Sequence, residues 1–323
     1  MAEIIRIIFS SEFLWTVIRA STPLVLATLG AHISLKAGII NIGTEGILLT
    51  GALVGVLFSA FILPIVGSVT VALILTFIFV VMVGAASGLF IGVFHLKLDS
   101  DIALTGIVFN LIASGLTVFL LFIVTGDKGV SSSLQSLVFP NIEIPLLKSI
   151  PFIGDILSGH NLLTYLAFFM VFVVWFTLNK TTFGLRVRAV GESPETVQSV
   201  GINVHNMKLK AIAISGALAA TGGMYLSMGY TSFFVSNMSA GRGFIALSAN
   251  AMGGSTIGGM LVSMLFGFAE TLAIFLELNT KIPGEIISMS PFIFVIVSLV
   301  LFSYNKKRKQ KNYFRKKWDK NFT

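Results

Sequence analysis

Residues 183–202 read FGLRVRAVGESPETVQSVGI and form a polar stretch between two apolar segments of membrane length, roughly 161–179 and 207–229. A helical membrane span needs about 20 mainly apolar residues. The whole chain follows this pattern, because 55% of its 323 residues are hydrophobic, 11% are charged and its mean hydropathy is +0.94. Soluble domains carry about 25% charged residues. No water-soluble fold could cover so much apolar surface, so the composition predicts a polytopic helical membrane protein.

The composition also excludes several other classes. The apolar runs are continuous rather than alternating, which argues against a transmembrane β-barrel. The chain has no cysteine, so disulfides and thiol chemistry are excluded. Its four histidines are scattered without metal-ligand spacing. The sequence therefore predicts neither a metal site nor a cofactor.

The apolar segments predict an all-α fold with about nine crossings. The stretch 240–257 is rich in small residues and is predicted to be a broken or re-entrant helix, since backbone left unpaired by a break must not face lipid. We count it as one crossing. The other candidate spans are roughly 12–35, 43–64, 67–94, 101–125, 161–179, 207–229, 258–277 and 286–304.

The basic residues are distributed unevenly between the two sides. The loop 180–210 holds five basic residues, whereas the loop 126–160 holds two, against three acidic ones. By the positive-inside rule the first loop is cytoplasmic and the second external. Nine of the 22 basic residues follow Tyr304. We therefore expect a single transmembrane domain, 1–304, and a basic cytoplasmic tail, 305–323, that contacts anionic lipid rather than nucleic acid. Nine crossings also place the N-terminus outside.

Two further features concern the loops and the symmetry of the chain. The loop 126–160 contains three prolines, which predict an ordered external cap rather than a mere connection. Gly-punctuated segments follow the first span (38–55) and the sixth (241–259). Interrupted helices at matching positions of two halves are typical of inverted-repeat transporters.

The polar stretch itself predicts a short capped helix at the cytoplasmic surface. Ser193 suits the N-cap, Pro194 the first helical position, and Glu195 the positive end of the helix. Gly201 suits the end of the helix. Such a helix between two spans, about two turns long and flanked by Arg186 and Arg188, is suited to docking a separate soluble subunit. The alternative is an ordinary capped loop helix.

A second polar stretch, residues 36–46 (KAGIINIGTEG), lies where the first span ends and the second begins. Its three glycines and Asn41 permit a sharp bend or an unwound turn. Glu45 is either an intramembrane carboxylate with a functional role or an interfacial residue that caps a helix N-terminus.

Three further polar residues lie at membrane depth. Asn110 and Asn250 either form interhelical hydrogen bonds or line a polar path. Glu270 lies near the middle of a span, where a carboxylate must be paired, protonated or wet, and its expected roles are gating and lining a path. The chain contains no Walker phosphate loop and no catalytic set, so we expect it not to be an enzyme.

These residues resemble the permease subunits of bacterial ABC importers, in the branch with ribose, branched-chain amino acid and nucleoside permeases. Residues 37–46 (AGIINIGTEG) look like the nucleoside-type pattern A/S-G-V-x-N-I-G-x-E-G. Residues 188–204 (RAVGESPETVQSVGINV) resemble the branch's cytoplasmic coupling segment, R-A-x-G-E-N-P-x-A-A-x-x-A-G-I-x-V. SGALA at 215–219 and GRGFIAL at 241–247 match two further blocks. The chain departs from the family where GGSTIG, 253–258, replaces G-R/K-W-x-P-x-G, and where Thr196-Val197 replaces two alanines.

The resemblance implies a multi-pass permease in a bacterial plasma membrane that moves nucleosides inward by alternating access. The implied partners are an ATP-hydrolysing subunit, a second homologous permease subunit and an extracellular substrate-binding protein. The implied ATPase-coupling residues are Arg188, Gly191, Glu192, Ser193, Pro194, Glu195, Gly201 and Ile202. The candidates for the substrate path and its gate are Asn41, Glu45, Asn110, Asn250 and Glu270.

Two alternatives remain open at this point. A simple-sugar ABC permease would have the same polar, uncharged path. A proton- or sodium-coupled secondary transporter would need a buried titratable carboxylate, for which Glu270 is the candidate.

Overall fold

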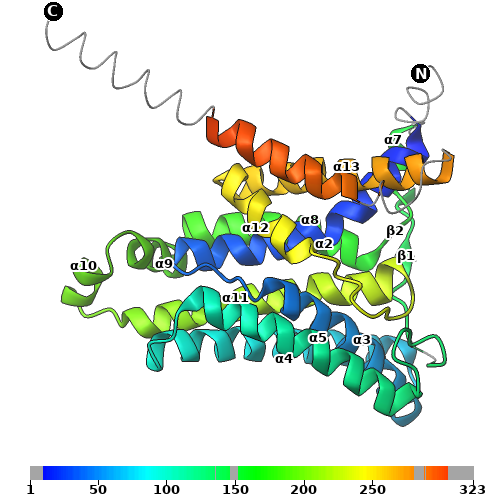
Figure 1. The fold of residues 1–323 in the computed structure, drawn as a ribbon, viewed down its shortest axis with the longest axis horizontal. Coiled ribbons are helices and arrows are strands. Elements are labelled where there is room, and N and C mark those ends of the chain that lie inside the picture. Colours follow the sequence, from blue (N-terminus) through cyan, green and yellow to red (C-terminus); the bar gives the residue numbers. More distant parts are fainter. Residues whose placement is uncertain (1–9, 135, 146–151, 280–286, 288, 305–323) are drawn as a thin grey trace, which may run out of the picture.

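The computed structural model describes residues 10–134, 136–145, 152–279, 287 and 289–304. Helices dominate this part of the chain, as the continuous apolar runs require, because a helix satisfies its backbone polar groups within one segment. Seven helices are long and apolar enough to cross a membrane, so the predicted all-α polytopic membrane fold is confirmed. They are α2 (Ser11–Lys36), α3 (Thr44–Val66), α4 (Val69–Lys97), α5 (Ile102–Thr125), α8 (Leu162–Lys180), α11 (Val204–Tyr225) with its π-helical extension η1 (Leu226–Tyr230), and α13 (Thr256–Asn279) (Figure 1).

Within the described residues, seven spanning helices are fewer than the nine crossings predicted. The stretch 240–257 forms α12 (Arg242–Gly253), whose 12 residues extend only about 18 Å, against roughly 30 Å of hydrocarbon. The expected last span, 286–304, lies partly outside the described residues. Its described helix, Met289–Tyr304, is shorter than the seven long ones. The stretch 240–257 is apolar enough to resemble a span, but its helix α12 is too short to be one.

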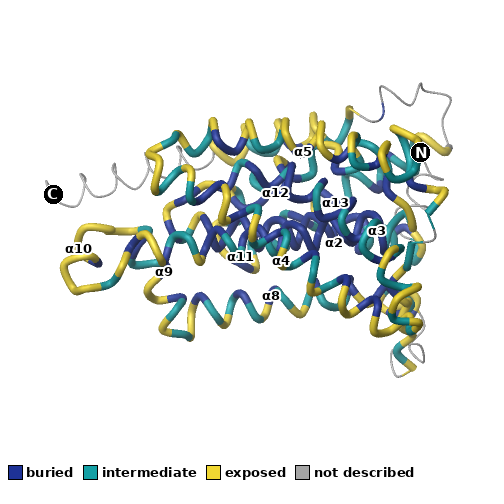
Figure 2. The backbone as a smooth tube through the Cα atoms, turned by 90° about the horizontal axis from the view of Figure 1, so that it is seen from below, coloured by how far each residue is buried: buried dark blue, intermediate teal, exposed yellow. Residues whose placement is uncertain are grey.

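Two helices form the centre of the bundle (Figure 2). In the most apolar 18-residue stretch of each helix, 78% of α2 and 83% of α11 with η1 is buried. The corresponding share of α5 is 17%, so α5 faces outward. Small residues allow α11 to pack closely on α4. A Cβ added to Gly84 would lie 2.5 Å from the carbonyl oxygen of Gly216. Gly84 and Gly216 therefore allow the close helix packing that is expected in membranes.

The two ends of the bundle differ in structure. Helices α9 (Thr182–Glu192) and α10 (Pro194–Ser199) project from one end, which we call the α10 end. The opposite end carries α7 (Ile153–Leu157) and a two-stranded ribbon of β1 (Asn141–Ile142) and β2 (His160–Asn161). Figure 1 places the start of α2 at this opposite end, and the last described helix, 289–304 (red), runs toward the α10 end.

The described parts of the loop 126–160 form an ordered cap. Ser131 donates its backbone N–H to the carbonyl of Phe234 (3.0 Å), and Phe139 donates to Met228 (3.0 Å). In the ribbon, Asn141 pairs with Asn161 and Ile142 with His160. The cap therefore closes over α11 and the segment that follows it, as the prolines of this loop predicted.

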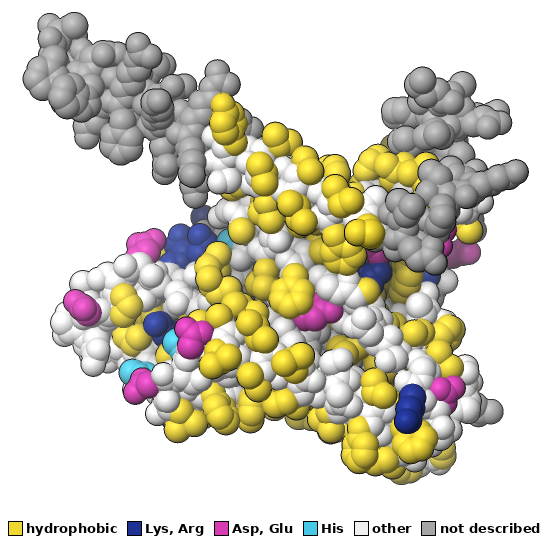
Figure 3. All heavy atoms as spheres, in the orientation of Figure 1, with side chains coloured by type: hydrophobic (Ala, Val, Ile, Leu, Met, Phe, Trp, Pro, Cys, Tyr) yellow, Lys and Arg dark blue, Asp and Glu magenta, His cyan; other side chains and the backbone are white. Residues whose placement is uncertain are grey.

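Side-chain chemistry follows this architecture. On the face shown in Figure 3, hydrophobic side chains cover most of the middle, and most charged ones lie toward the two ends. A membrane protein needs this distribution, because charged side chains are costly within the hydrocarbon.

Candidate functional site

Two breaks in the helices meet inside the bundle. The first is residues 37–43, between α2 and α3, and the second is residues 231–241, between η1 and α12. Glu45, in the first turn of α3, joins them. Its Oε1 accepts hydrogen bonds from Ser239 Oγ (2.6 Å) and the backbone N–H of Gly241 (2.8 Å), and its Oε2 accepts one from the N–H of Gly243 (2.7 Å). One carboxylate therefore closes the start of α12.

Local sequence explains why α12 begins there. Gly241 adopts φ +78°, a left-handed conformation that suits glycine. Gly243 lies so close to Glu45 that an added Cβ would come within 2.6 Å of its Cα. Helix N-termini carry partial positive charge and attract anions, and Glu45 lies at the starts of both α3 and α12. Glu45 therefore binds the N-terminus of a helix, as one of the two expectations held, but the helix is α12, which is distant in sequence.

Asn110 stabilises the first break. Its Oδ1 accepts from the N–H of Gly46 (2.7 Å), and its Nδ2 donates to the carbonyl of Ile42 (3.0 Å). Asn110 is eight residues past the start of α5, which places it about 12 Å along that helix. The Glu45 junction is therefore well inside the bundle. Asn110 forms the interhelical hydrogen bonds expected of it, and both go to backbone groups that the break leaves unpaired.

Asn41 lies within the same break and is fully buried. Its Nδ2 donates to Ser215 Oγ of α11 (3.0 Å). Its Oδ1 has no hydrogen-bond partner within the described residues. A buried amide oxygen without a partner is costly, so Asn41 has an acceptor available beside the junction.

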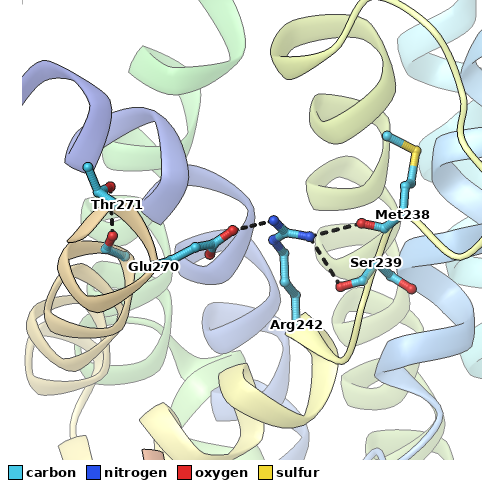
Figure 4. Close-up of polar contacts among 6 residues, drawn as sticks. Met238, Ser239, Arg242, Glu270 and Thr271 are labelled. Carbon is cyan, nitrogen blue, oxygen red and sulfur yellow. Dashed lines mark hydrogen bonds and ion pairs between the residues drawn. The ribbon is translucent and has the colours of Figure 1, made fainter. Parts of the chain in front are cut away.

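Glu270 pairs with a residue that sequence reasoning overlooked. Figure 4 shows the guanidinium of Arg242 between the Glu270 carboxylate, with which it forms an ion pair, and the carbonyls of Met238 (2.9 Å) and Ser239 (3.4 Å). Only 17% of the Arg242 and 15% of the Glu270 side chain is exposed. Of the three states open to Glu270, the structure selects the paired one. Arg242 is the single basic residue between Lys210 and Lys281, and that isolation was the signal that could have identified it.

Asn250 belongs to a different part of α12. Its Oδ1 lies 2.8 Å from Nδ1 of His32 on α2. One turn earlier, Thr28 of α2 donates to the carbonyl of Ala246 (3.2 Å). The fold thus brings Asn41, Glu45, Asn110 and Glu270 to the two breaks, and it places Asn250 further along α12, toward the α10 end.

The short helix predicted after Ser193 is present. Pro194 begins α10, Gly201 adopts φ +83° after it, and Val197 is its single buried residue. The predicted side-chain cap by Ser193 is wrong, because Ser193 Oγ contacts Thr196 Oγ1 (2.8 Å) and no backbone N–H. A hydroxyl partner one turn away competes with the backbone for the same oxygen. Apart from Val197, every residue of α10 is exposed.

The remaining coupling candidates lie on α9 or just beyond α10. Arg188, Gly191 and Glu192 belong to α9, and Ile202 donates its N–H to the carbonyl of Val197 (3.3 Å). Gly191 packs against the end of α2: a Cβ added to it would meet the carbonyl oxygen of Lys36 and lie 3.1 Å from the N of Gly38. The end of α9 thus contacts the first break directly.

Comparison with known proteins identifies the family. Residues 13–302 match the family described as "Branched-chain amino acid transport system / permease component". The chain belongs to this permease family. The chain is 35% identical over 287 residues to the nucleoside ABC transporter permease protein NupC of Lactococcus lactis subsp. cremoris (strain MG1363), which covers 87% of this chain and 89% of that protein.

Two other relatives of the permease are similar over most of their length. The guanosine ABC transporter permease protein NupQ of Bacillus subtilis (strain 168) is 33% identical over 287 residues, covering 87% of this chain and 89% of that protein. The putative glucose ABC transporter permease protein TsgC13 of Haloferax volcanii is 32% identical over 273 residues, covering 82% and 77%. The predicted membership of the permease family, with nucleoside-type members among its near relatives, is confirmed.

Proposed function

We propose that this chain is a permease subunit of an ATP-driven importer whose substrates are nucleosides. The observation that carries the proposal is its similarity, over nearly the whole length of both chains, to relatives named as nucleoside and guanosine ABC transporter permeases. A nucleoside is uncharged and rich in hydrogen-bonding groups. The junction offers matching chemistry in the buried Asn41 Oδ1, which has no partner among the described residues, and in the part-exposed carboxylate of Glu45.

The partners of the permease are an ATP-hydrolysing subunit, a second homologous permease subunit and an extracellular substrate-binding protein. The ATPase docks on α10, which the fold leaves exposed on nearly every side. In this arrangement the α10 end and the tail 305–323, which lies outside the described residues, are cytoplasmic. The cap of the loop 126–160 then faces the binding protein. The basic residues of 180–210 support this orientation.

A physical route connects the docking helix with the junction. Movement of α10 displaces α9, whose Gly191 is in close contact with Lys36 and Gly38. That displacement moves the break 37–43, and with it Glu45, which holds the start of α12. Closure of the ATPase on nucleotide would thereby open or close the path at the two breaks. Rigid helices that turn about short unwound segments are a common means of alternating access.

The two alternative functions differ from this one in specific ways. The observation that supports a sugar permease is the similarity to TsgC13, a putative glucose ABC transporter permease protein. A proton-coupled carrier is disfavoured, because Glu270 neutralises Arg242 and does not lie alone in the bundle.

The test is uptake by the complete transporter, reconstituted with its ATPase and binding protein in liposomes. We expect accumulation of radiolabelled guanosine or uridine that needs ATP and stops with vanadate. Unlabelled nucleoside should compete and glucose should not. Competition by glucose alone would support the sugar permease instead, and uptake driven by a pH gradient without ATP would support the secondary transporter.

A further inference from the structure

A basic cavity lies at the α10 end of the bundle, apart from the two breaks. Its volume is about 220 Å³. The ends of α2, α8 and α9 and the turn between α12 and α13 surround it. The polar residues that line it are His32, Lys36, Asn179, Arg188, Ser255 and Thr256.

The charge of this cavity is unbalanced. Lys36 and Arg188 contribute two cationic side chains, and none of the described residues that line it carries a carboxylate. Arg188 Nε is buried and has no hydrogen-bond partner within the described residues. The ion pair of Arg242 with Glu270 lies elsewhere, and Lys36 and Arg188 form none in the part of the chain that the structure describes. An unpaired buried donor on a charged group is costly, so an anion that accepts from Arg188 would stabilise the site.

The start of α13 adds donors of the same kind. Ser255 precedes this helix. Its Oγ accepts a hydrogen bond from the N–H of Gly258 (3.0 Å), and its carbonyl accepts one from the N–H of Gly259 (2.8 Å). The N–H groups of Thr256 and Ile257, in the first turn, have no acceptor within their own helix. Both residues line the cavity, and a helix N-terminus favours an anion such as phosphate.

The size and position of the cavity indicate what kind of ligand it can hold. Pockets for drug-sized ligands measure roughly 300–1,000 Å³, so this smaller cavity of about 220 Å³ suits a compact anionic group. The cavity lies at the ends of long apolar helices, beside Trp175. Tryptophan is enriched where membranes meet water.

We propose that this cavity binds a phosphate group, either the head group of an acidic phospholipid or free phosphate. The phosphate would accept from Arg188, Lys36 and the first turn of α13. It would thereby tie α9 to α2 and α13, next to the contact of Gly191 with Lys36. The proposal concerns ligand binding and does not depend on the transported substrate.

The experiment uses the purified full-length chain in detergent. Retained phosphatidylglycerol and phosphatidylcholine are counted by native mass spectrometry, and the shift in Tm is measured with added inorganic phosphate against chloride at equal ionic strength. The variants are Lys36→Gln and Arg188→Gln. The matched control is Arg186→Gln, an exposed arginine on the same helix.

The two sources of phosphate give different results. If a lipid head group is bound, both variants should retain phosphatidylglycerol at least about tenfold less well, as expected for loss of one charged hydrogen bond, and the control should retain it normally. If free phosphate is bound, the phosphate-dependent rise in Tm should disappear in both variants and persist in the control. Equal lipid retention and equal Tm shifts in all four proteins would overturn the proposal.

A second variant covers the case in which these substitutions prevent folding. Ser255→Asp keeps a good N-cap for α13 and places a fixed carboxylate at the cavity. It should remain folded and lose both phosphatidylglycerol and the response to phosphate. Normal binding of either ligand by this variant would also contradict the proposal.

Discussion

At the scale of single residues, Glu45 holds the start of α12 with one carboxylate that accepts three hydrogen bonds. We predict that Glu45→Gln lowers the free energy of unfolding by about 1–3 kcal/mol, the usual cost of losing a hydrogen bond to a charged group. The amide nitrogen cannot accept from the N–H of Gly243, and a neutral side chain no longer complements the helix dipole.

Thermal unfolding of the purified protein measures this effect of Glu45. Glu277→Gln is the control, because Glu277 is an exposed carboxylate near the C-terminal end of α13. An unchanged Tm for the Glu45 variant would show that the carboxylate does not hold α12.

Arg242 and Glu270 should behave as one unit. Either Arg242→Gln or Glu270→Gln leaves a poorly solvated charge without its partner, which we expect to lower Tm and impair uptake. The double variant removes both charges and should recover part of each loss. A double-mutant cycle on Tm measures the coupling. Strictly additive losses would contradict the paired role, and residual uptake of the double variant should still require ATP.

His160 should make the cap sensitive to acid. Burial lowers the pKa of His160, with Arg19 of α2 contributing in the same direction and the carbonyl of Ile156 opposing it. Its ring stacks on Trp15 at 5.0 Å and meets the edge of Tyr165. The unfolded chain then binds a proton more readily than the folded one, so stability should fall as the pH drops below about 6.5. Tm measured at neutral and mildly acidic pH should diverge less in His160→Gln. An identical pH response in that variant would assign the effect to other groups.

At the scale of elements, α10 is a helix of six residues that buries only Val197. Its contribution to the hydrophobic core is therefore too small to explain why the helix is there. We predict that Gly201→Val reduces recovery of the ATPase with the purified permease by at least about tenfold and abolishes uptake, because its left-handed φ of +83° is strained for a β-branched residue. Glu192→Ala should act in the same direction.

The opposite end of the molecule offers a matched control for α10. Gly159 has φ +79° and open space around its Cα, as Gly201 has. Gly159→Val should cost similar backbone strain and leave the association with the ATPase intact. If both glycine variants lost the ATPase equally, general destabilisation rather than docking would be the cause.

At the scale of the whole molecule, the bundle has two chemically different ends, and its orientation in the membrane can be tested directly. The chain has no cysteine, so single cysteines can be introduced at known places. In intact cells, Ser132→Cys in the cap should react with a membrane-impermeant thiol reagent. Ser193→Cys and Lys309→Cys should react only after the cells are opened. Labelling at Ser193 from outside would reverse the orientation and remove the basis for an ATPase at α10.

Sequence alone determined those properties that depend on neighbours along the chain. The expected spans 12–35 and 101–125 became α2 and α5 almost residue for residue, because insertion of a helix depends on the summed apolarity of consecutive residues. Pro194 and Gly201 marked the ends of α10 for an equally local reason, since each restricts or permits particular backbone angles.

Tertiary structure alone decided which distant groups meet. Glu45 closes a helix that begins almost 200 positions later, the bond to Gly243 spanning 198 residues, and Glu270 finds Arg242 on another helix. The sequence also did not determine how long the helix within 240–257 is. Composition shows how apolar a stretch is, whereas the start of α12 is fixed by its hydrogen bonds to Glu45. A buried charge must be paired wherever it lies, but its partner is set by the packing of helices that are far apart in the chain.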